Sequence, residues 1–419
     1  MARKKILVPI FNRAHYGRLR SVLRAVEKHP KLELQIMVAS FAAYDYFLMN
    51  LKHSRPHSWA LALKWYIRAR LLSLFDFGNH TLFKTDFLMS HLRAEGLNIV
   101  SRIPMFLDGG LNETMAKSVG LGLVNLVDEL KRLKPDLVFI NADRFEMMAV
   151  ALASAFLNIP IAHNEGGDVS GTIDESVRHA ITKLAHLHFT ATQKSRGRVI
   201  QMGENPQYVF TVGSPVIDIL KQLNLTISPD LIPGFDFEKP YLLVLLHPVA
   251  TESKEYNALM AVNLIKVLEE FKMPTIFLGS NIDAGSDMVG KTVRAWRAER
   301  KPPFGFFTKH LPPDDFYRVL AKAACAIGNS SSFIREGAYF GTPAVIIGSR
   351  QHNRDRGRNV REVTVAKEVI ASTIRDQLRH GRYREDTLFG DGRAGERIAE
   401  LLAEVNPPIQ KIFYEQNTN

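Results

Sequence analysis

The chain has 419 residues, which is more than one hydrophobic core usually holds, so we expect two domains. Charged residues make up 23% and hydrophobic residues 46%, a globular composition that excludes long disordered regions. The formal net charge of +11 suits anionic ligands, and Lys and Arg are spread along the chain. We therefore expect a small anionic substrate and no nucleic-acid partner.

The chain contains one cysteine, Cys325, inside the apolar run 323–327, where we expect it to be buried. One cysteine excludes an intrachain disulfide and a cysteine-based zinc cluster, which fits a reducing, cytoplasmic compartment. The apolar run near the amino terminus is too short for a signal peptide. Because no stretch of about 18 uninterrupted apolar residues occurs, we expect no membrane span.

The first half of the chain alternates predicted strands with predicted helices. The strands are expected at 5–11, 34–39, 98–104, 137–140, 159–162, 187–191 and 208–212, and the helices at 13–27, 112–133, 145–158, 172–186 and 194–202. Such alternation predicts a parallel sheet with right-handed crossovers. No Gly-x-Gly-x-x-Gly motif follows the first strand, so a dinucleotide fingerprint is not supported.

The segment 43–92 does not follow this alternation. Within it, 59–77 is typical of one or two apolar helices that carry Lys64, Arg68 and Arg70. A basic amphipathic helix can lie on a membrane or cover a partner surface. We favour packing against the same domain or a second subunit, as a lid or a contact in a homodimer or homotetramer.

A second alternating series begins after Gly213-Ser-Pro215, which we interpret as the domain boundary. Strands are expected at 241–246, 275–278, 324–327 and 343–347, and helices at 257–271, 286–300, 313–321 and 332–340. The two series predict an α/β protein with two parallel-sheet domains, 1–212 and 213–395, that face a central cleft.

Two carboxylates follow neighbouring strands of the first series. Asp143 comes after the run 137–140, and Glu165 comes after 159–162. Open parallel sheets bind ligands at the carboxyl ends of their strands, so both side chains are expected at a ligand site. His163 and Glu165 are two residues apart and would point the same way in an extended chain.

The helix after Glu165 adds a third carboxylate. Thr172 and Glu175 have the spacing of a capping box, and Asp174 and Arg178 are spaced i,i+4. Crowding of carboxylates raises their proton affinity toward neutrality, which suits general acid and base catalysis. The alternative is structural: Asp143 caps the next helix and Arg178 pairs with Asp174.

Two features of the second half indicate a nucleotide site. His247 follows an apolar strand, and Gly-Asn-Ser-Ser-Ser at 328–332 separates a strand from a helix. A helix amino terminus with hydroxyl side chains can hold a phosphate, with Ser330 and Ser331 as donors and Glu336 as an acceptor for ribose hydroxyls. Alternatively, the serines only cap their helix. The basic run 354–358 lacks aromatic residues and is interpreted as a solvated face.

Together these motifs resemble the hydrolysing UDP-N-acetylglucosamine 2-epimerases and their relatives that act on UDP-2,4-diacetamido sugars. The resemblance is carried by Arg13-Ala, by the segments 115–123, 142–146, 163–167, 170–189, 247–249, 281–286 and 328–332 and by Arg350-Gln. It implies a GT-B fold, with two Rossmann-like domains and a carboxyl-terminal helix, 396–419, that returns to the first domain. It implies no cofactor and no metal.

The resemblance also implies a reaction and a role for each matching residue. The C2 proton is removed, UDP leaves from C1 to give a glycal, and water addition then releases N-acetylmannosamine for sialic acid-type synthesis. The implied catalytic residues are Asp143, Glu165, Asp174 and His247, and the implied substrate-binding residues are Arg13, His163, Arg178, Asn281, Ser330, Ser331, Glu336 and Arg350.

The chain departs from the family pattern mainly on the sugar side. His15 replaces an aspartate, Ala142 a glycine, Asn164 an isoleucine and Asp168 a glutamate. A UDP-sugar substrate is therefore better supported than any particular sugar. The alternatives are a UDP-2,4-diacetamido sugar as substrate, a non-hydrolysing epimerase, a GT-B glycosyltransferase and a non-catalytic UDP-sugar sensor.

Overall fold

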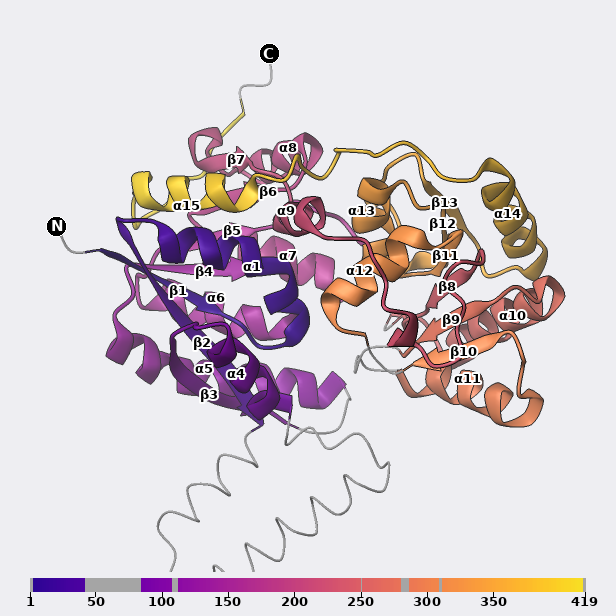
Figure 1. Cartoon of the computed structure of the whole chain (residues 1–419). Coiled ribbons are helices and arrows are strands. Elements are labelled where there is room, and N and C mark those ends of the chain that lie inside the picture. Colours follow the sequence, from indigo (N-terminus) through magenta and orange to yellow (C-terminus); the bar gives the residue numbers. More distant parts are fainter. Residues whose placement is uncertain are drawn as a thin grey trace, which may run out of the picture.

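The computed structural model describes residues 3–41, 84–107, 112–249, 251–279, 286–308 and 311–416. Two parallel sheets lie side by side, each covered by helices (Figure 1). This confirms the predicted architecture of two parallel-sheet α/β domains. The helices predicted at 59–77 and the site residue Asn281 lie outside the described residues.

The first sheet has seven strands in the order β3-β2-β1-β4-β5-β6-β7, all parallel. The strands are β1 (Lys4–Pro9), β2 (Leu32–Phe41), β3 (Ile99–Phe106), β4 (Leu137–Asn141), β5 (Ile161–Asn164), β6 (Leu187–Thr190) and β7 (Val209–Thr211). Its helices are α1 (Arg13–Lys28), α4 (Lys84–Ala94), α5 (Asn112–Leu133), α6 (Phe145–Phe156), α7 (Ile173–Leu184) and α8 (Gln193–Gln201). The strand order reverses between β1 and β4, the place where such sheets bind ligands.

The second sheet has six parallel strands in the order β10-β9-β8-β11-β12-β13. The strands are β8 (Leu242–Leu245), β9 (Thr275–Leu278), β10 (Gly305–Thr308), β11 (Cys325–Gly328), β12 (Ala344–Ile347) and β13 (Val360–Val363). The helices of this half are α9 (Pro215–Gln222), α10 (Lys254–Phe271), α11 (Ser286–Arg300), α12 (Pro313–Lys322), α13 (Ser331–Phe340) and α14 (Lys367–His380), and the last helix of the chain is α15 (Ala394–Glu404). Short 3-10 turns occupy Pro206–Tyr208, Pro229–Leu231 and Ser349–Gln351.

Both faces of the first sheet are buried by apolar side chains. Leu19 and Val22 of α1 pack on one face, together with Phe139 of β4. Val138 of β4 and Met147 of α6 belong to the core on the opposite face. Because the strands are buried on both faces, they read as continuous apolar runs, which explains why the sequence predicted them.

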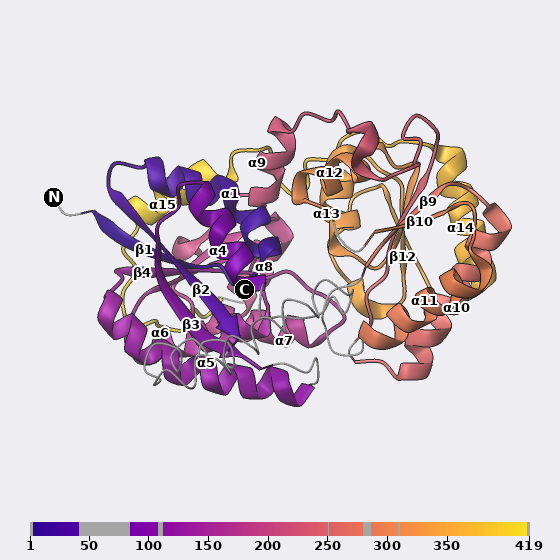
Figure 2. The same ribbon diagram turned by 60° about the horizontal axis from the view of Figure 1, so that its bottom comes forward.

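The carboxyl-terminal helix α15 returns to the first domain, beside α1 (Figures 1 and 2). Asp218 of α9 accepts hydrogen bonds from the backbone N–H groups of Ala394 (2.9 Å) and Gly395 (2.7 Å), which caps the start of α15. The helix ends at Glu404, so the predicted helical segment 396–419 is too long. The chain beyond it runs over the first domain, where the backbone N–H of Tyr414 donates to the carbonyl of Gly203.

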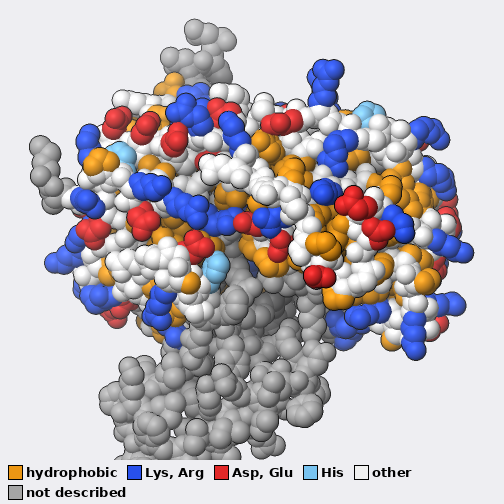
Figure 3. All heavy atoms as spheres, in the orientation of Figure 1, with side chains coloured by type: hydrophobic (Ala, Val, Ile, Leu, Met, Phe, Trp, Pro, Cys, Tyr) orange, Lys and Arg blue, Asp and Glu red, His pale blue; other side chains and the backbone are white. Residues whose placement is uncertain are grey.

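The visible face of the molecule mixes charges of both signs (Figure 3). On that face Lys and Arg side chains are interspersed with Asp and Glu side chains over both domains. Among the described residues, no helix has both the length and the apolar character needed to cross a membrane.

Candidate active site

Asp143 and Glu165 follow adjacent parallel strands, as predicted. β4 ends at Asn141 and β5 at Asn164, and these two residues are partners in the sheet register. After each strand the backbone turns at a residue with a left-handed conformation, Ala142 (φ 60°) after β4 and Glu165 (φ 63°) after β5. The two carboxylates therefore leave the sheet at the same edge.

The expectation that His163 and Glu165 point the same way is wrong, because the extended conformation ends at Asn164. The His163 ring is fully buried, with Nε2 2.8 Å from the carbonyl oxygen of Ala142 and Nδ1 3.1 Å from the Thr182 hydroxyl. Burial lowers the pKa of His163 to about 4, so the ring is neutral. Since both nitrogens have partners inside the domain, His163 supports the turn before Asp143, and the predicted substrate contact is not supported.

The left-handed turn at Ala142 leads to a stability prediction. An L-residue in this conformation costs about 1–2 kcal/mol relative to its preferred regions, and glycine avoids most of that cost. We expect Ala142→Gly to leave the thermal midpoint unchanged or to stabilise the fold by up to about 1 kcal/mol. The matched change Ala149→Gly, inside α6, should destabilise by about 1 kcal/mol. Thermal unfolding of both variants checks this prediction. A loss of stability in Ala142→Gly larger than that in Ala149→Gly would contradict it.

Arg178 forms an ion pair with Asp143, a contact that the structural alternative of pairing with Asp174 did not include. The guanidinium is buried, and its Nη1 also donates to the carbonyl of Asp168 (2.8 Å). The Asp143 side chain keeps 20% of its surface exposed, which leaves it accessible to a ligand. Arg178 thus fixes the orientation of the Asp143 side chain.

Asp174 lies in the first turn of α7 and is half-buried. The predicted capping box before it does not form, because the Thr172 side chain makes no capping hydrogen bond. The Glu175 carboxylate instead accepts from the backbone N–H of Ser170. Thr172 is still the N-cap residue, directly before the first residue of α7.

Glu165 connects the two domains. Its Oε1 accepts hydrogen bonds from Arg335 Nη1 of α13 (2.6 Å) and from the Ser214 hydroxyl (2.7 Å). Burial would raise the pKa of this carboxyl, but Arg335, Arg18 and Ser214 outweigh burial and lower it to about 2. The expectation that crowding raises carboxylate proton affinity is therefore wrong for Glu165, which is ionised in this conformation.

The loops after β8 and β11 are joined through one asparagine. Asn329 accepts from the backbone N–H of His247 (2.7 Å) through Oδ1 and donates to the carbonyl of His247 (2.8 Å) through Nδ2. Its own carbonyl accepts from Arg350 (3.1 Å) and Gln351 (3.0 Å). Gly328 (φ 143°) passes so close to Leu245 that a Cβ atom would lie 2.0 Å from its carbonyl oxygen. His247 and Arg350 are therefore held next to the start of α13.

The serine-rich loop forms the amino end of α13. Ser330 caps the helix, since its hydroxyl accepts from the backbone N–H of Ser332 (3.3 Å). Glu336, one turn later, is buried and accepts from the Ser332 hydroxyl (3.3 Å) through Oε1, while Oε2 has no hydrogen-bond partner. Capping by Ser330 and phosphate binding at the same helix end are compatible, because Ser330 accepts from the N–H groups of Ser332 and Phe333 and not from that of Ser331.

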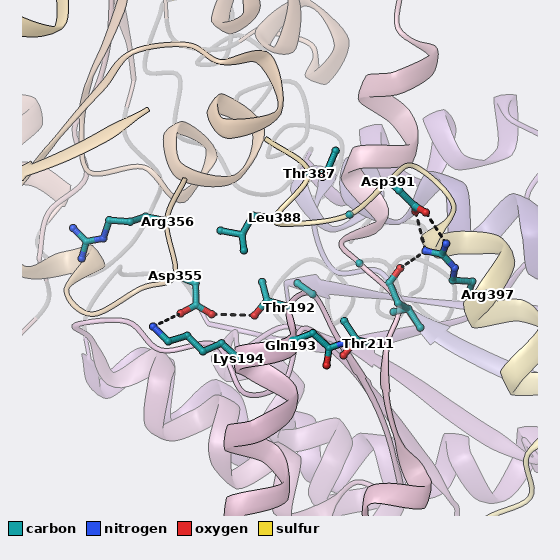
Figure 4. A pocket seen from close by; sticks show the side chains of 14 residues that line it. Thr192, Gln193, Lys194, Thr211, Asp355, Arg356, Thr387, Leu388, Asp391 and Arg397 are labelled. Carbon is teal, nitrogen blue, oxygen red and sulfur yellow. Dashed lines mark hydrogen bonds and ion pairs between the residues drawn. The ribbon is translucent and has the colours of Figure 1, made fainter. Parts of the chain in front are cut away.

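The basic run 354–358 is not a solvated face. Arg354 donates to Asp168 of the first domain (3.0 Å), and Asp355 accepts from Arg198 (2.8 Å) and Thr192 (3.0 Å). Figure 4 shows Asp355 between Lys194 and Thr192 at the rim of a cavity of about 480 Å³. None of the predicted site residues lines that cavity, so it is separate from the candidate active site.

The residues missed by sequence reasoning are those that join the domains. Arg335 reaches Glu165, Arg354 reaches Asp168, and Arg20 of α1 pairs with Asp314 of α12. Each partner lies in the other half of the chain, so no local spacing signals the pair. Arg13 is the first residue of α1, and its side chain is outside the described residues.

Comparisons with known proteins point to one enzyme family. A family model described as UDP-N-acetylglucosamine 2-epimerase matches residues 72–403. The chain is 32% identical over 402 residues to UDP-N,N'-diacetylbacillosamine 2-epimerase (hydrolyzing) of Legionella pneumophila, with 95% of each chain covered. It is 27% identical over 426 residues to UDP-N-acetylglucosamine 2-epimerase of Neisseria meningitidis, covering 99% of this chain and 100% of the relative.

A solved structure shows the same fold. The crystal structure of UDP-GlcNAc 2-epimerase from Neisseria meningitidis bound to UDP-GlcNAc matches with a TM-score of 0.74 at 14% identity, covering 96% of this chain and 100% of that chain. The two parallel-sheet domains thus have the predicted GT-B arrangement. From the family match and the relative with 32% identity, we conclude that the chain belongs to the UDP-N-acetylglucosamine 2-epimerase family.

Proposed function

We propose that the protein is a hydrolysing 2-epimerase, which converts a UDP-linked 2-acetamido sugar into UDP and the free 2-epimeric sugar. The observation that carries this proposal is the ion pair between Glu165 and Arg335. It joins the carboxylates at the edge of the first sheet to the helix α13, whose amino end can bind a diphosphate. The relative from Legionella pneumophila, named as a hydrolyzing 2-epimerase, supports the hydrolytic outcome.

The nucleotide end of the substrate is assigned to the second domain. Ser330 and Ser331 at the start of α13, together with the Arg350 guanidinium, provide donors for the diphosphate. Oε2 of Glu336 lies 3.5 Å from Arg335 Nε but accepts no hydrogen bond, so it is proposed to accept one from a ribose hydroxyl. Arg13, at the amino end of α1, and Asn281 are proposed as further ligands of the substrate.

The reaction has two stages. A carboxylate first takes the C2 proton, the C1–O bond breaks, and its electron pair leaves with UDP, so that a C1=C2 double bond forms. Water then gives its hydroxyl to C1, and C2 receives a proton on the opposite face. Since two proton transfers at one carbon need a base and an acid on opposite sides, more than one acidic residue is required.

The geometry suggests how the carboxylates share these tasks. Asp143, paired with Arg178 and partly exposed, is proposed as the base that removes the C2 proton. Asp174 and His247 are proposed to complete the second proton transfer. Glu165, held ionised by Arg335, is proposed to position the sugar at the junction of the two domains.

Two substrates follow from the relatives. We propose UDP-N,N'-diacetylbacillosamine first, because the relative of that name is 32% identical over 95% of the chain. UDP-N-acetylglucosamine is the second, from the Neisseria meningitidis relative, and would yield N-acetylmannosamine for sialic acid-type synthesis. A cytoplasmic homodimer or homotetramer remains a prediction.

The experiment is to incubate the purified protein with each substrate and to separate the products by chromatography. We expect UDP to be released in equal amount with a free reducing sugar, and a higher kcat/KM for the diacetamido substrate. A 2-epimer that still carries UDP as the only product would identify a non-hydrolysing epimerase. Transfer of the sugar to an added acceptor would identify a glycosyltransferase.

A further inference from the structure

Three buried polar side chains near the candidate active site have hydrogen-bonding atoms without partners. The side chains are His15 (3% exposed), Asn141 (2%) and Asn164 (0%). The unpartnered atoms are Nδ1 and Nε2 of His15, Nδ2 of Asn141 and Oδ1 of Asn164. Buried polar atoms without partners are rare because each loses its hydration without replacement, so this cluster requires an explanation.

The three side chains lie in one layer between α1 and the first sheet. His15 is on the same helical face as Leu19, Val22 and Val26, which pack on the sheet. Phe139 and Ala162 belong to the same core, and side chains alternate along a strand, so Asn141 and Asn164 share their face two residues later. All three therefore stand at the carboxyl edge of the sheet, one layer beyond the apolar core.

The hydrogen-bonding pattern of this layer is complementary to an amide. Asn164 Nδ2 donates to Asn141 Oδ1 (2.7 Å), which leaves one N–H donor on Asn141 and one oxygen acceptor on Asn164. His15 is neutral, because burial and the nearby guanidiniums of Arg144 and Arg18 lower its pKa to about 3. A neutral imidazole adds one donor and one acceptor. The layer carries no charge of its own, so it suits a neutral polar group better than a phosphate.

We propose that His15, Asn141 and Asn164 form a subsite for an acetamido group of the substrate sugar. This inference rests on the proposed function and deepens it. Asp143 and Glu165 follow Asn141 and Asn164 directly, so a group bound in this subsite lies next to the acid-base residues.

The test compares a ligand that has a sugar with one that has none. The variants Asn164→Ile and His15→Leu each remove a side chain that would hydrogen-bond the acetamido group. Neither variant changes the diphosphate site in the other domain. We expect kcat/KM for the UDP-sugar to fall about tenfold to a hundredfold, and the inhibition constant of UDP to stay within about twofold. Leu19→Val, one turn further along α1, is the control and should change neither value.

The two substrates show which acetamido group is read. An equal loss with UDP-N-acetylglucosamine and UDP-N,N'-diacetylbacillosamine assigns the subsite to the C2 acetamido group. A loss confined to the diacetamido substrate assigns it to C4. Unchanged kcat/KM in folded variants, or an equal weakening of UDP and UDP-sugar, would overturn the subsite and leave buried water as the occupant. If the wild type turns over neither sugar, the proposed function fails, and calorimetric binding of the same ligands tests the subsite alone.

Discussion

Asp143→Asn is expected to lower kcat by roughly 10²- to 10⁴-fold, the range typical of lost general acid-base catalysis. The amide keeps the shape of the side chain and can still accept a hydrogen bond from Arg178, but it cannot take the C2 proton. The nucleotide contacts assigned to Ser330, Ser331 and Arg350 come from the other domain. We therefore expect the affinity for UDP to change little, as measured by calorimetry.

The matched control is Asp136→Asn. Asp136 precedes β4, at the end of the strand opposite to Asp143, and accepts a hydrogen bond from the backbone N–H of Lys5 (2.8 Å). The same chemical change there should leave kcat within about twofold, because it is exposed and far from the carboxyl edge. An Asp143→Asn variant with most of its activity would exclude Asp143 as the base.

Arg335→Met is expected to destabilise the protein by about 3–5 kcal/mol, because it leaves Glu165 buried without its ion-pair partner. Both side chains are almost fully buried, at 1% and 5% exposed, so water cannot replace the guanidinium. Adding Glu165→Gln removes the uncompensated charge and should recover most of the loss. Denaturant unfolding of the two single variants and the double variant measures this coupling.

The same pair predicts a pH dependence. The pKa of Glu165 is about 2 in the folded protein, below its value of about 4.3 in an unfolded chain. Ionised Glu165 therefore stabilises the folded protein by an amount on the order of 3 kcal/mol. This stabilisation is present above about pH 5 and is lost as the pH falls toward 2. The gap in unfolding free energy between wild type and Arg335→Met should narrow over this range. A gap that is independent of pH would show that the ion pair does not stabilise the fold.

The elements with strong local signals could be predicted from the sequence. The bounds of α5, β9 and α11 were predicted to the residue. β10 and β13 were missed, because Gly305–Thr308 and Val360–Val363 are short and only partly apolar or buried. The helices α9 and α14 were missed as well. The helix predicted at 145–158 ends two residues earlier in the structure, at Phe156. Asn158 adopts a left-handed conformation (φ 54°), through which a right-handed α-helix cannot continue.

The candidate site could be predicted only as far as its local motifs extend. The positions of Asp143 and Glu165 after β4 and β5 follow from strand ends that the sequence shows. Their ion-pair partners do not follow from the sequence. The sequence alone does not say whether Arg178 pairs with Asp143 or with Asp174, and Arg335 is 170 residues from Glu165. The pKa of Glu165 was expected to rise because crowding by carboxylates was visible in the sequence, whereas the guanidinium from the second domain was not.

The central claim is that proton removal at C2 accompanies hydrolytic loss of UDP. Proton NMR in D2O with UDP-N,N'-diacetylbacillosamine and, separately, UDP-N-acetylglucosamine follows the sugar, UDP and the hydrogen at C2 in one sample. The predicted result is a free 2-epimeric sugar with deuterium at C2 and an equal amount of UDP. A free sugar that keeps its C2 proton, or an epimer still joined to UDP, would contradict the account.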